Sequence, residues 1–273
     1  MEFEFGQTDQ SDAFFDRNPK FMPAFERLMT VANKCFGREI KPKNRPEDII
    51  FWLGHSSRED YLEVVFLAVH GYGLATSKIL RGLYERAVTL AYLIEEPDKA
   101  ERFVRFAAIQ EHRALEAALK FISETEFDEM MGPANSVALI RQRYDEVKSD
   151  FGTTLCKKCG TKRIQSTWDL DVAAMVHKVG DPYNKLFLGA YTIPNFQIRA
   201  TLASTSAGQE GKTKTARRLR DAEFALLNAT CILIHVIRSQ TRFFSLNLDV
   251  ELENCKKDFV DMCNTYGARG HFN

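Results

Sequence analysis

The sequence predicts an all-α protein, built as a single bundle-like domain with a small cysteine-bearing insert. Apolar residues recur at three- and four-residue spacing through most of the chain, and alternating strand patterns with turn pairs are nearly absent. Only 15 Gly and 8 Pro occur among the 273 residues, which excludes collagen-like and linker-type proteins. The 21 Phe residues favour a filled core over disorder.

The elements of the first part of the chain follow from its composition and its start signals. Residues 1–18 are acidic and polar, and we expect a flexible N-terminal extension without a secretory signal. A first helix is predicted over 20–36. After a proline-bearing loop, Pro46 and the two acidic residues that follow it are typical of a helix first turn. A further helix is expected to start at Ser57.

The segment 77–94 is apolar on most of its circumference, so we expect it in the middle of a bundle. Further elements are predicted in chain order at about 99–122, 134–151, 169–178, 182–191, 216–244 and 250–266, with the insert at about 152–167. Because the chain shows no internal repeat and no convincing linker, we expect one domain over 19–273.

The charge balance limits the classes of function. There are 37 basic and 37 acidic residues, so the whole chain cannot attract nucleic acid by net charge, although a local basic patch can. The densest basic run lies within 212–220. The longest apolar run, 224–237, is interrupted by Asn228 and His235 and is predicted to be too short to span a bilayer. We therefore expect a cytoplasmic protein without a membrane partner.

Arg81 and Glu85 are four residues apart on the central helix, a spacing at which the two side chains can form an ion pair. Charges enter such an apolar helix mainly when they are paired or functional. One interpretation is a structural ion pair, and the other is a pair that lines a pocket.

Arg105 and His112 are seven residues apart on the next predicted helix and so lie nearly in line. An Arg and a His separated by six residues fit the loose spacing of HEPN-type ribonucleases. In such enzymes the His acts as acid or base and the Arg steadies the phosphate. The position after the Arg, usually polar there, is Phe106 in this chain. The alternative is an ordinary solvated helix face.

The long helix near the C-terminus carries a polar residue at each heptad step. These residues are Asp221, Asn228, His235 and Arg242. Such a stripe is typical of a solvent-facing surface, and it also fits a polar seam against a partner helix.

Cys156 and Cys159, followed by Gly160, resemble one knuckle of a zinc site, in which Gly permits the tight turn. Zinc needs four ligands, so the remaining ones would come from Cys255, Cys263 and His271 or from a second chain. The alternatives are a structural zinc ion and two free thiols.

Residues 77–103 and a second block, Trp168, 183–191 and 197–201, resemble a prokaryotic family of unknown function, DUF5677. The resemblance covers about residues 55–245 and implies a fold similar in outline to HEPN-type helical proteins, many of which act in toxin–antitoxin or antiviral systems. It also implies a His where this chain has Arg199. If that His is catalytic in relatives, this chain has lost a catalytic residue or is an altered form of the family.

The sequence therefore predicts an RNA-cleaving, HEPN-like toxin or antiviral defence component. Its candidate site would gather Arg81, Glu85, Arg105, His112 and Arg199. The alternative is a non-catalytic helical module that binds a protein partner or a second copy of itself.

Overall fold

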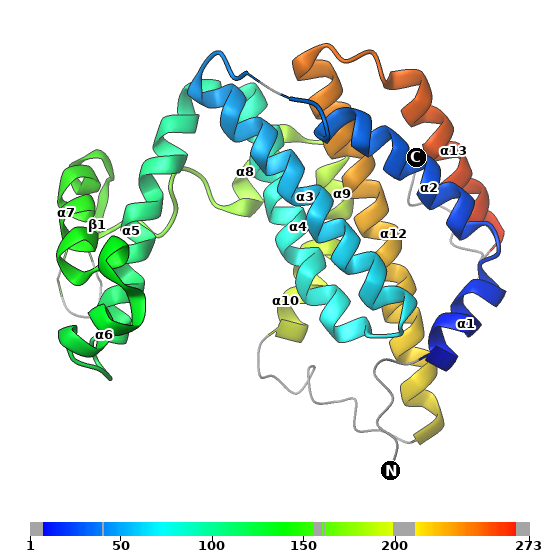
Figure 1. Cartoon of the computed structure of the whole chain (residues 1–273), viewed down its shortest axis with the longest axis horizontal. Coiled ribbons are helices and arrows are strands. Elements are labelled where there is room, and N and C mark those ends of the chain that lie inside the picture. The colour runs from blue at the N-terminus through cyan, green and yellow to red at the C-terminus, as the bar shows by residue number, and fades with distance from the viewer. Residues whose placement is uncertain (1–7, 40, 156–159, 161, 199–210, 266–273) are drawn as a thin grey trace. The chain divides into compact units, whose positions relative to one another are not determined.

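The computed structural model describes residues 8–39, 41–155, 160, 162–198 and 211–265. The protein is all-α, as predicted: helices form nearly all of its regular structure (Figure 1). The contacts divide the chain into two compact units. Unit 1 consists of residues 1–95 and 172–273, and unit 2 of residues 96–171. The expectation of one domain over residues 19–273 stays a prediction.

Three long helices form the centre of unit 1: α3 (Arg45–Val69), α4 (Gly73–Glu95) and α12 (Gly211–Phe244), which pack side by side (Figure 1). As predicted, α4 is buried on most of its circumference; Leu80, Leu83 and Leu93 are at most 1% exposed. Burial of such apolar surface is the main driving force for this arrangement.

Shorter helices cover this centre. α2 (Phe21–Phe36) packs against α13 (Asp249–Thr265) and also contacts α12. The segment after residue 171 forms α8 (Val172–Val179), α9 (Tyr183–Phe187), the π-helical turn η4 (Leu188–Thr192) and α10 (Ile193–Ile198). α8, η4 and α10 each contact α4, so the second block of the family resemblance lies against the first.

Two local predictions differ from the structure. Residues 8–17, inside the predicted flexible extension, form α1 (Thr8–Arg17). Phe14 is buried there and its ring meets the ring of Phe21 edge-on at 5.1 Å, a contact that the acidic composition conceals. Ser57 does not start a helix, because α3 is continuous; its buried hydroxyl donates to the carbonyl of Leu53 inside the helix.

Unit 2 is built on α5 (Ala100–Ala118) and α7 (Val137–Val147), which pack against each other. Its other elements are η1 (Pro97–Lys99), α6 (Glu124–Met131), η2 (Pro133–Asn135) and η3 (Lys148–Asp150), with the strands β1 (Thr153–Leu155) and β2 (Lys162–Ile164). The strands pair antiparallel with Leu155 opposite Lys162, so the predicted insert is a short hairpin. Cys156 and Cys159, between the strands, lie outside the described residues.

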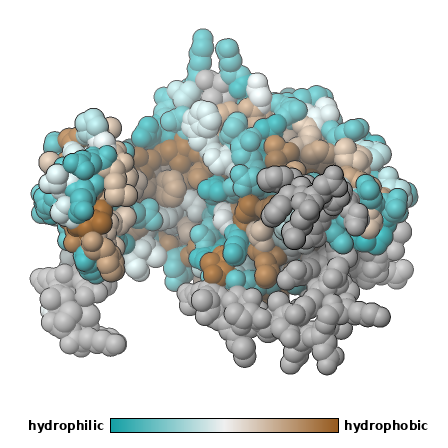
Figure 2. Space-filling view, turned by 60° about the horizontal axis from the view of Figure 1, so that its bottom comes forward, coloured by the Kyte–Doolittle hydropathy of each residue, from teal (hydrophilic) through white to brown (hydrophobic). Residues whose placement is uncertain are grey.

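Within the described part of the chain, one helical segment, Asp221–Phe244 of α12, is long and apolar enough to cross a membrane by length and composition. However, 67% of its apolar window is buried inside the protein, which is the pattern of a core helix. Apolar residues also reach the surface elsewhere, and Figure 2 shows them as brown areas among hydrophilic ones. Trp52 and Phe66 of α3 are 53% and 63% exposed.

Candidate functional site

Unit 2 contains a groove of about 1100 Å³ between α5, the end of α7 and the hairpin. Six side chains of its lining carry a charge or a polar aromatic group: His112, Arg113, Glu116, Lys120, Tyr144 and Lys148. They come from α5, α7 and the turns that follow each of these helices, and the antiparallel packing of α5 and α7 brings them together. Of the residues predicted for the site, His112 is the one that lines this groove.

The imidazole of His112 is held by its neighbours. Its ring stacks on the ring of Tyr144 of α7, with centroids 3.8 Å apart and planes 13° from parallel. Its Nε2 lies 3.8 Å from Oε1 of Glu116, one helical turn further along α5. The His112 side chain is 21% exposed, so solvent and a ligand can still reach it. The stack fixes the plane of the ring and leaves the ring edge with Nε2 toward Glu116 at the groove.

Three cations line the same groove, and they differ in how they are engaged. Arg113 donates from one terminal nitrogen to the carbonyls of Ile164 (3.0 Å) and Gln165 (2.6 Å), which ties α5 to the hairpin. Lys148 pairs with Asp145 at 2.6 Å. Lys120 is exposed and has no ion-pair partner among the described residues. The groove therefore has cationic groups suited to an anionic ligand.

Arg105 has a structural environment. Its guanidinium pairs with the carboxylate of Asp150 at 2.5 Å and donates to the carbonyl of Glu146 at 3.2 Å. Arg105 thus joins α5 to the end of α7 and to η3. Arg102 makes similar links from α5, because it donates to the carbonyls of Asp150 and Trp168. Arg105 is not part of the groove lining. The predicted phosphate-binding role of Arg105 has no direct geometric support in unit 2.

Arg81 and Glu85 form the ion pair that their spacing predicts, with Nε and Oε1 2.8 Å apart. The two side chains are 29% and 37% exposed, so the pair is partly solvated and not fully buried. The guanidinium also lies 5.3 Å from the ring centre of Tyr191 in η4, within cation–π distance. This cluster joins α4 to the π-helical turn that precedes α10.

The predicted site residues are therefore distributed over both units. Arg81 and Glu85 belong to unit 1, and Arg105 and His112 belong to unit 2. Arg199 lies outside the described residues. Glu116 was not predicted, although its spacing of four from His112 is a usable signal. Tyr144 and Lys148 were not predicted either, because the packing of α5 against α7 brings them to His112.

The polar stripe of α12 runs from partly exposed Asp221 through buried Asn228 and partly exposed His235 to exposed Arg242. Asn228 is buried and its amide donates to the carbonyl of Phe224 at 2.8 Å. Burial, with the nearby charge of Arg238, lowers the pKa of His235 to about 4. These two positions are therefore part of the packing of unit 1 and not of a solvent face.

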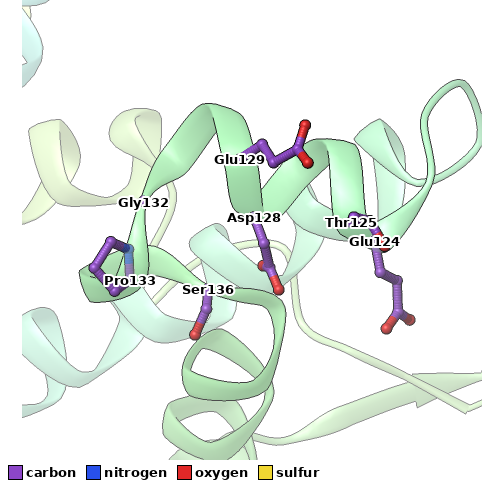
Figure 3. Close-up of a pocket in the computed structure, with 7 residues that line it drawn as sticks. All are labelled: Glu124, Thr125, Asp128, Glu129, Gly132, Pro133 and Ser136. Carbon is purple, nitrogen blue, oxygen red and sulfur yellow. The ribbon is translucent and has the colours of Figure 1, made fainter.

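An acidic pocket of about 650 Å³ lies along α6 and the connection from α6 to α7 (Figure 3). Glu124, Asp128 and Glu129 line it, but Asp128 accepts from the backbone N–H of Val137 at 2.7 Å and so caps α7. Among the described residues, no group of three or more His, Cys, Asp or Glu side chains is arranged to hold a metal ion. Cys255, one predicted zinc ligand, is a buried thiol whose pKa is raised to about 11 by burial.

The segment from α3 to the end of α10 identifies the family of the chain. No curated protein and no solved structure matches the sequence. A family model matches residues 53–205, a span of more than half of the 273 residues, and this span includes both groups of predicted site residues. The chain therefore belongs to the family of unknown function DUF5677.

Proposed function

We propose that the groove of unit 2 binds single-stranded RNA and that the chain cleaves it without a metal ion, as a HEPN-like ribonuclease. One observation carries the proposal: a partly exposed His112, held flat against Tyr144, faces a groove lined by Arg113, Lys120 and Lys148. Proton transfer by a positioned imidazole and electrostatic stabilisation of a phosphate are the two ingredients that such cleavage needs.

The phosphate-binding role is reassigned within unit 2. Arg105 is engaged by Asp150 and by a backbone carbonyl, whereas Lys120 lines the groove and is available to a ligand. A lysine is a mobile point charge that suits phosphate oxygens. We therefore assign the contact with the scissile phosphate to Lys120, with Lys148 as a second cation.

A role in a toxin or antiviral defence system, in the cytoplasm of a prokaryote, rests on the resemblance to HEPN-type proteins alone. In this reading the activity would be kept low until needed. Arg199 stands where the resemblance implies a His, so we expect the chain to be a weak nuclease by itself and Arg199→His to raise the rate.

A second candidate function is a non-catalytic module that binds a protein or a second copy of the chain. The observation that favours it is the exposed apolar surface of α3, where Phe66 lines a shallow groove with Leu62 and Leu67. Solvent-exposed apolar surface of this kind is often a site of contact with another protein. The two functions predict different outcomes with RNA: the ribonuclease cleaves it, and the binding module leaves it intact.

The test compares a single-stranded RNA with DNA of the same sequence in the presence of EDTA. We expect the RNA to be bound and slowly cut and the DNA to stay whole, because the 2′-hydroxyl is the attacking group. Lys120→Ala should lower the slope of log affinity against log salt by about 0.7, and Lys41→Ala, an exposed lysine of unit 1, should not. If the wild-type chain and Arg199→His both leave RNA intact, the ribonuclease function is excluded and the binding module remains.

A further inference from the structure

Cleavage of RNA by its own 2′-hydroxyl needs two proton transfers, and one imidazole can perform only one of them in each step. A base must take the proton of the 2′-hydroxyl, and an acid must give one to the departing 5′-oxygen. The proposed function assigns His112 and the cations of the groove, which leaves the second proton-transfer group unassigned.

Glu116 is placed to be that group. It lies one turn after His112 on α5, its Oε1 is 3.8 Å from Nε2 of His112, and both side chains line the groove. The Glu116 side chain is 52% exposed. Its other partner is Arg141 of α7 at 3.9 Å, which forms a shorter pair with Glu124 at 2.8 Å. The Glu116 carboxylate is therefore loosely held and can turn away from His112 when a phosphate enters.

We propose that Glu116 and His112 are the base and the acid of one RNA-cleaving site, an inference that rests on the proposed function. Glu116 takes the proton of the 2′-hydroxyl, and the 2′-oxygen forms a bond to phosphorus. The bond between phosphorus and the 5′-oxygen breaks, and protonated His112 gives its Nε2 proton to that oxygen. The products are a 2′,3′-cyclic phosphate and a 5′-hydroxyl, and the two side chains regain their starting states by exchanging one proton with each other or with water.

The surroundings of the pair fit this division of roles. Arg113, Lys120 and Lys148 line the same groove and offset the repulsion between the Glu116 carboxylate and the phosphate. The ring of Tyr144 stacks on one face of the imidazole and keeps its plane fixed while the proton moves. Together with Arg141 and Glu124, these are the charged and titratable groups that face the pair from α5, α6, α7 and the turns after α5 and α7.

The neighbouring carboxylate provides a matched control. Glu124 is 55% exposed and forms the shorter pair with Arg141, so Glu124→Gln disturbs the same arginine without removing the proposed base. Glu116→Gln keeps the size of the side chain and one acceptor oxygen, but the amide cannot take a proton at neutral pH. Both variants change exposed side chains, so both should fold, as a thermal melt will show.

The experiment measures single-turnover cleavage of single-stranded RNA against pH, RNA affinity and the ends of the products. We expect Glu116→Gln to cut at least 10²-fold more slowly, to lose the fall in rate at acidic pH, and to bind RNA at least as tightly as the wild type. Glu116→Asp should regain part of the rate, Glu124→Gln should cut normally, and the wild-type products should carry 2′,3′-cyclic phosphate ends.

The possible results distinguish a failure of the role of Glu116 from a failure of the proposed ribonuclease function. If the wild type cuts RNA and Glu116→Gln cuts as fast with the same pH profile, Glu116 is not the base, and the ribonuclease function still stands. Equal losses in Glu116→Gln and Glu124→Gln would reduce Glu116 to a support of Arg141 and overturn the inference as well. If neither the wild type nor Arg199→His cuts RNA, the proposed function fails and the inference fails with it.

Discussion

Gly54 of α3 packs against the side chains of Gln240 in α12 and Phe36 in α2. A Cβ at this position would be 2.8 Å from Cδ of Gln240 and 2.8 Å from Cε1 of Phe36. Gln240 cannot easily retreat, because it is fully buried and its amide donates to the carbonyl of Ile50 at 2.5 Å. We predict that Gly54→Ala destabilises the protein by about 1–3 kcal/mol, measured by urea unfolding.

Gly82 of α4 is the matched control for this prediction. A Cβ there meets only the end of the Arg86 side chain, at 3.8 Å, which is ordinary contact. Gly82→Ala should therefore leave stability unchanged or raise it by about 0.5–1 kcal/mol, as alanine does inside a helix. Equal stability of the two alanine variants would contradict the close packing described at Gly54.

His235 makes the stability of unit 1 sensitive to acid. Its folded pKa is lowered to about 4 by burial and by the charges of Arg238, Lys256 and Arg242, compared with 6.5 for a solvated histidine. The unfolded chain therefore binds the proton first, so stability is full above pH 6.5 and falls as the pH drops toward 4. The loss attributable to this residue is about 3 kcal/mol.

The measurement is urea unfolding at pH 7 and at pH 4.5, for the wild type and for His235→Gln. We expect the difference in unfolding free energy between the two pH values to be smaller in the variant, which cannot take up the proton. An identical pH dependence in both proteins would show that His235 is not the sensitive group.

At the residue scale, local spacing predicts local pairs but not long-range ones. The distance of four residues on a helix was enough to anticipate the contact between Arg81 and Glu85, and it applies equally to His112 and Glu116. The stack of His112 on Tyr144 joins residues 32 positions apart in sequence and depends on the register of α5 against α7. The spacing of residues along one helix does not predict the register between two helices.

At the scale of elements, α3 begins with a side-chain cap and a proline in its first turn. Asn44 has extended backbone angles, and its side-chain oxygen accepts from the backbone N–H of Glu47 at 3.0 Å. We predict that Asn44→Ala costs about 1 kcal/mol of stability, and that Asn44→Asp keeps most of it because its carboxylate accepts the same bond. A thermal melt that shows no difference between the two variants would contradict the cap.

The long helices were predictable because their apolar spacing continues over many turns, as in α4 and α12. The short elements were not. The strands β1 and β2 have three residues each, which is too short for an alternating pattern to appear. The π-helical turn η4 interrupts a segment that reads as one helix over 182–191, and nothing in the spacing announces it.

On the scale of the whole molecule, the chain leaves one compact unit after residue 95 and returns to it at residue 172. The helices α5, α6 and α7 of unit 2 each bury one apolar face, as helices of unit 1 do, and the sequence shows no composition shift or linker at these two points. The division into two units depends on which helices contact each other, and the sequence does not show those contacts. The candidate site was only partly predictable because it too depends on contacts between helices.

The zinc hypothesis also concerns the whole molecule, because a knuckle of two cysteines needs ligands from elsewhere or from a second chain. We predict about one equivalent of zinc per chain or per dimer, lost when Cys156 and Cys159 are both replaced by Ser. Elemental analysis of protein purified without added metal measures this directly. Protein that contains no zinc would leave the two cysteines as free thiols.

The central claim is that unit 2 holds an RNA-cleaving site in which His112 moves a proton. Its most direct test is the single-turnover rate of single-stranded RNA cleavage in EDTA by His112→Ala, with His177→Ala, an exposed histidine of α8, as the control. We predict a rate at least 10²-fold below that of the wild type for His112→Ala and an unchanged rate for His177→Ala. Cleavage by His112→Ala at the wild-type rate would contradict it.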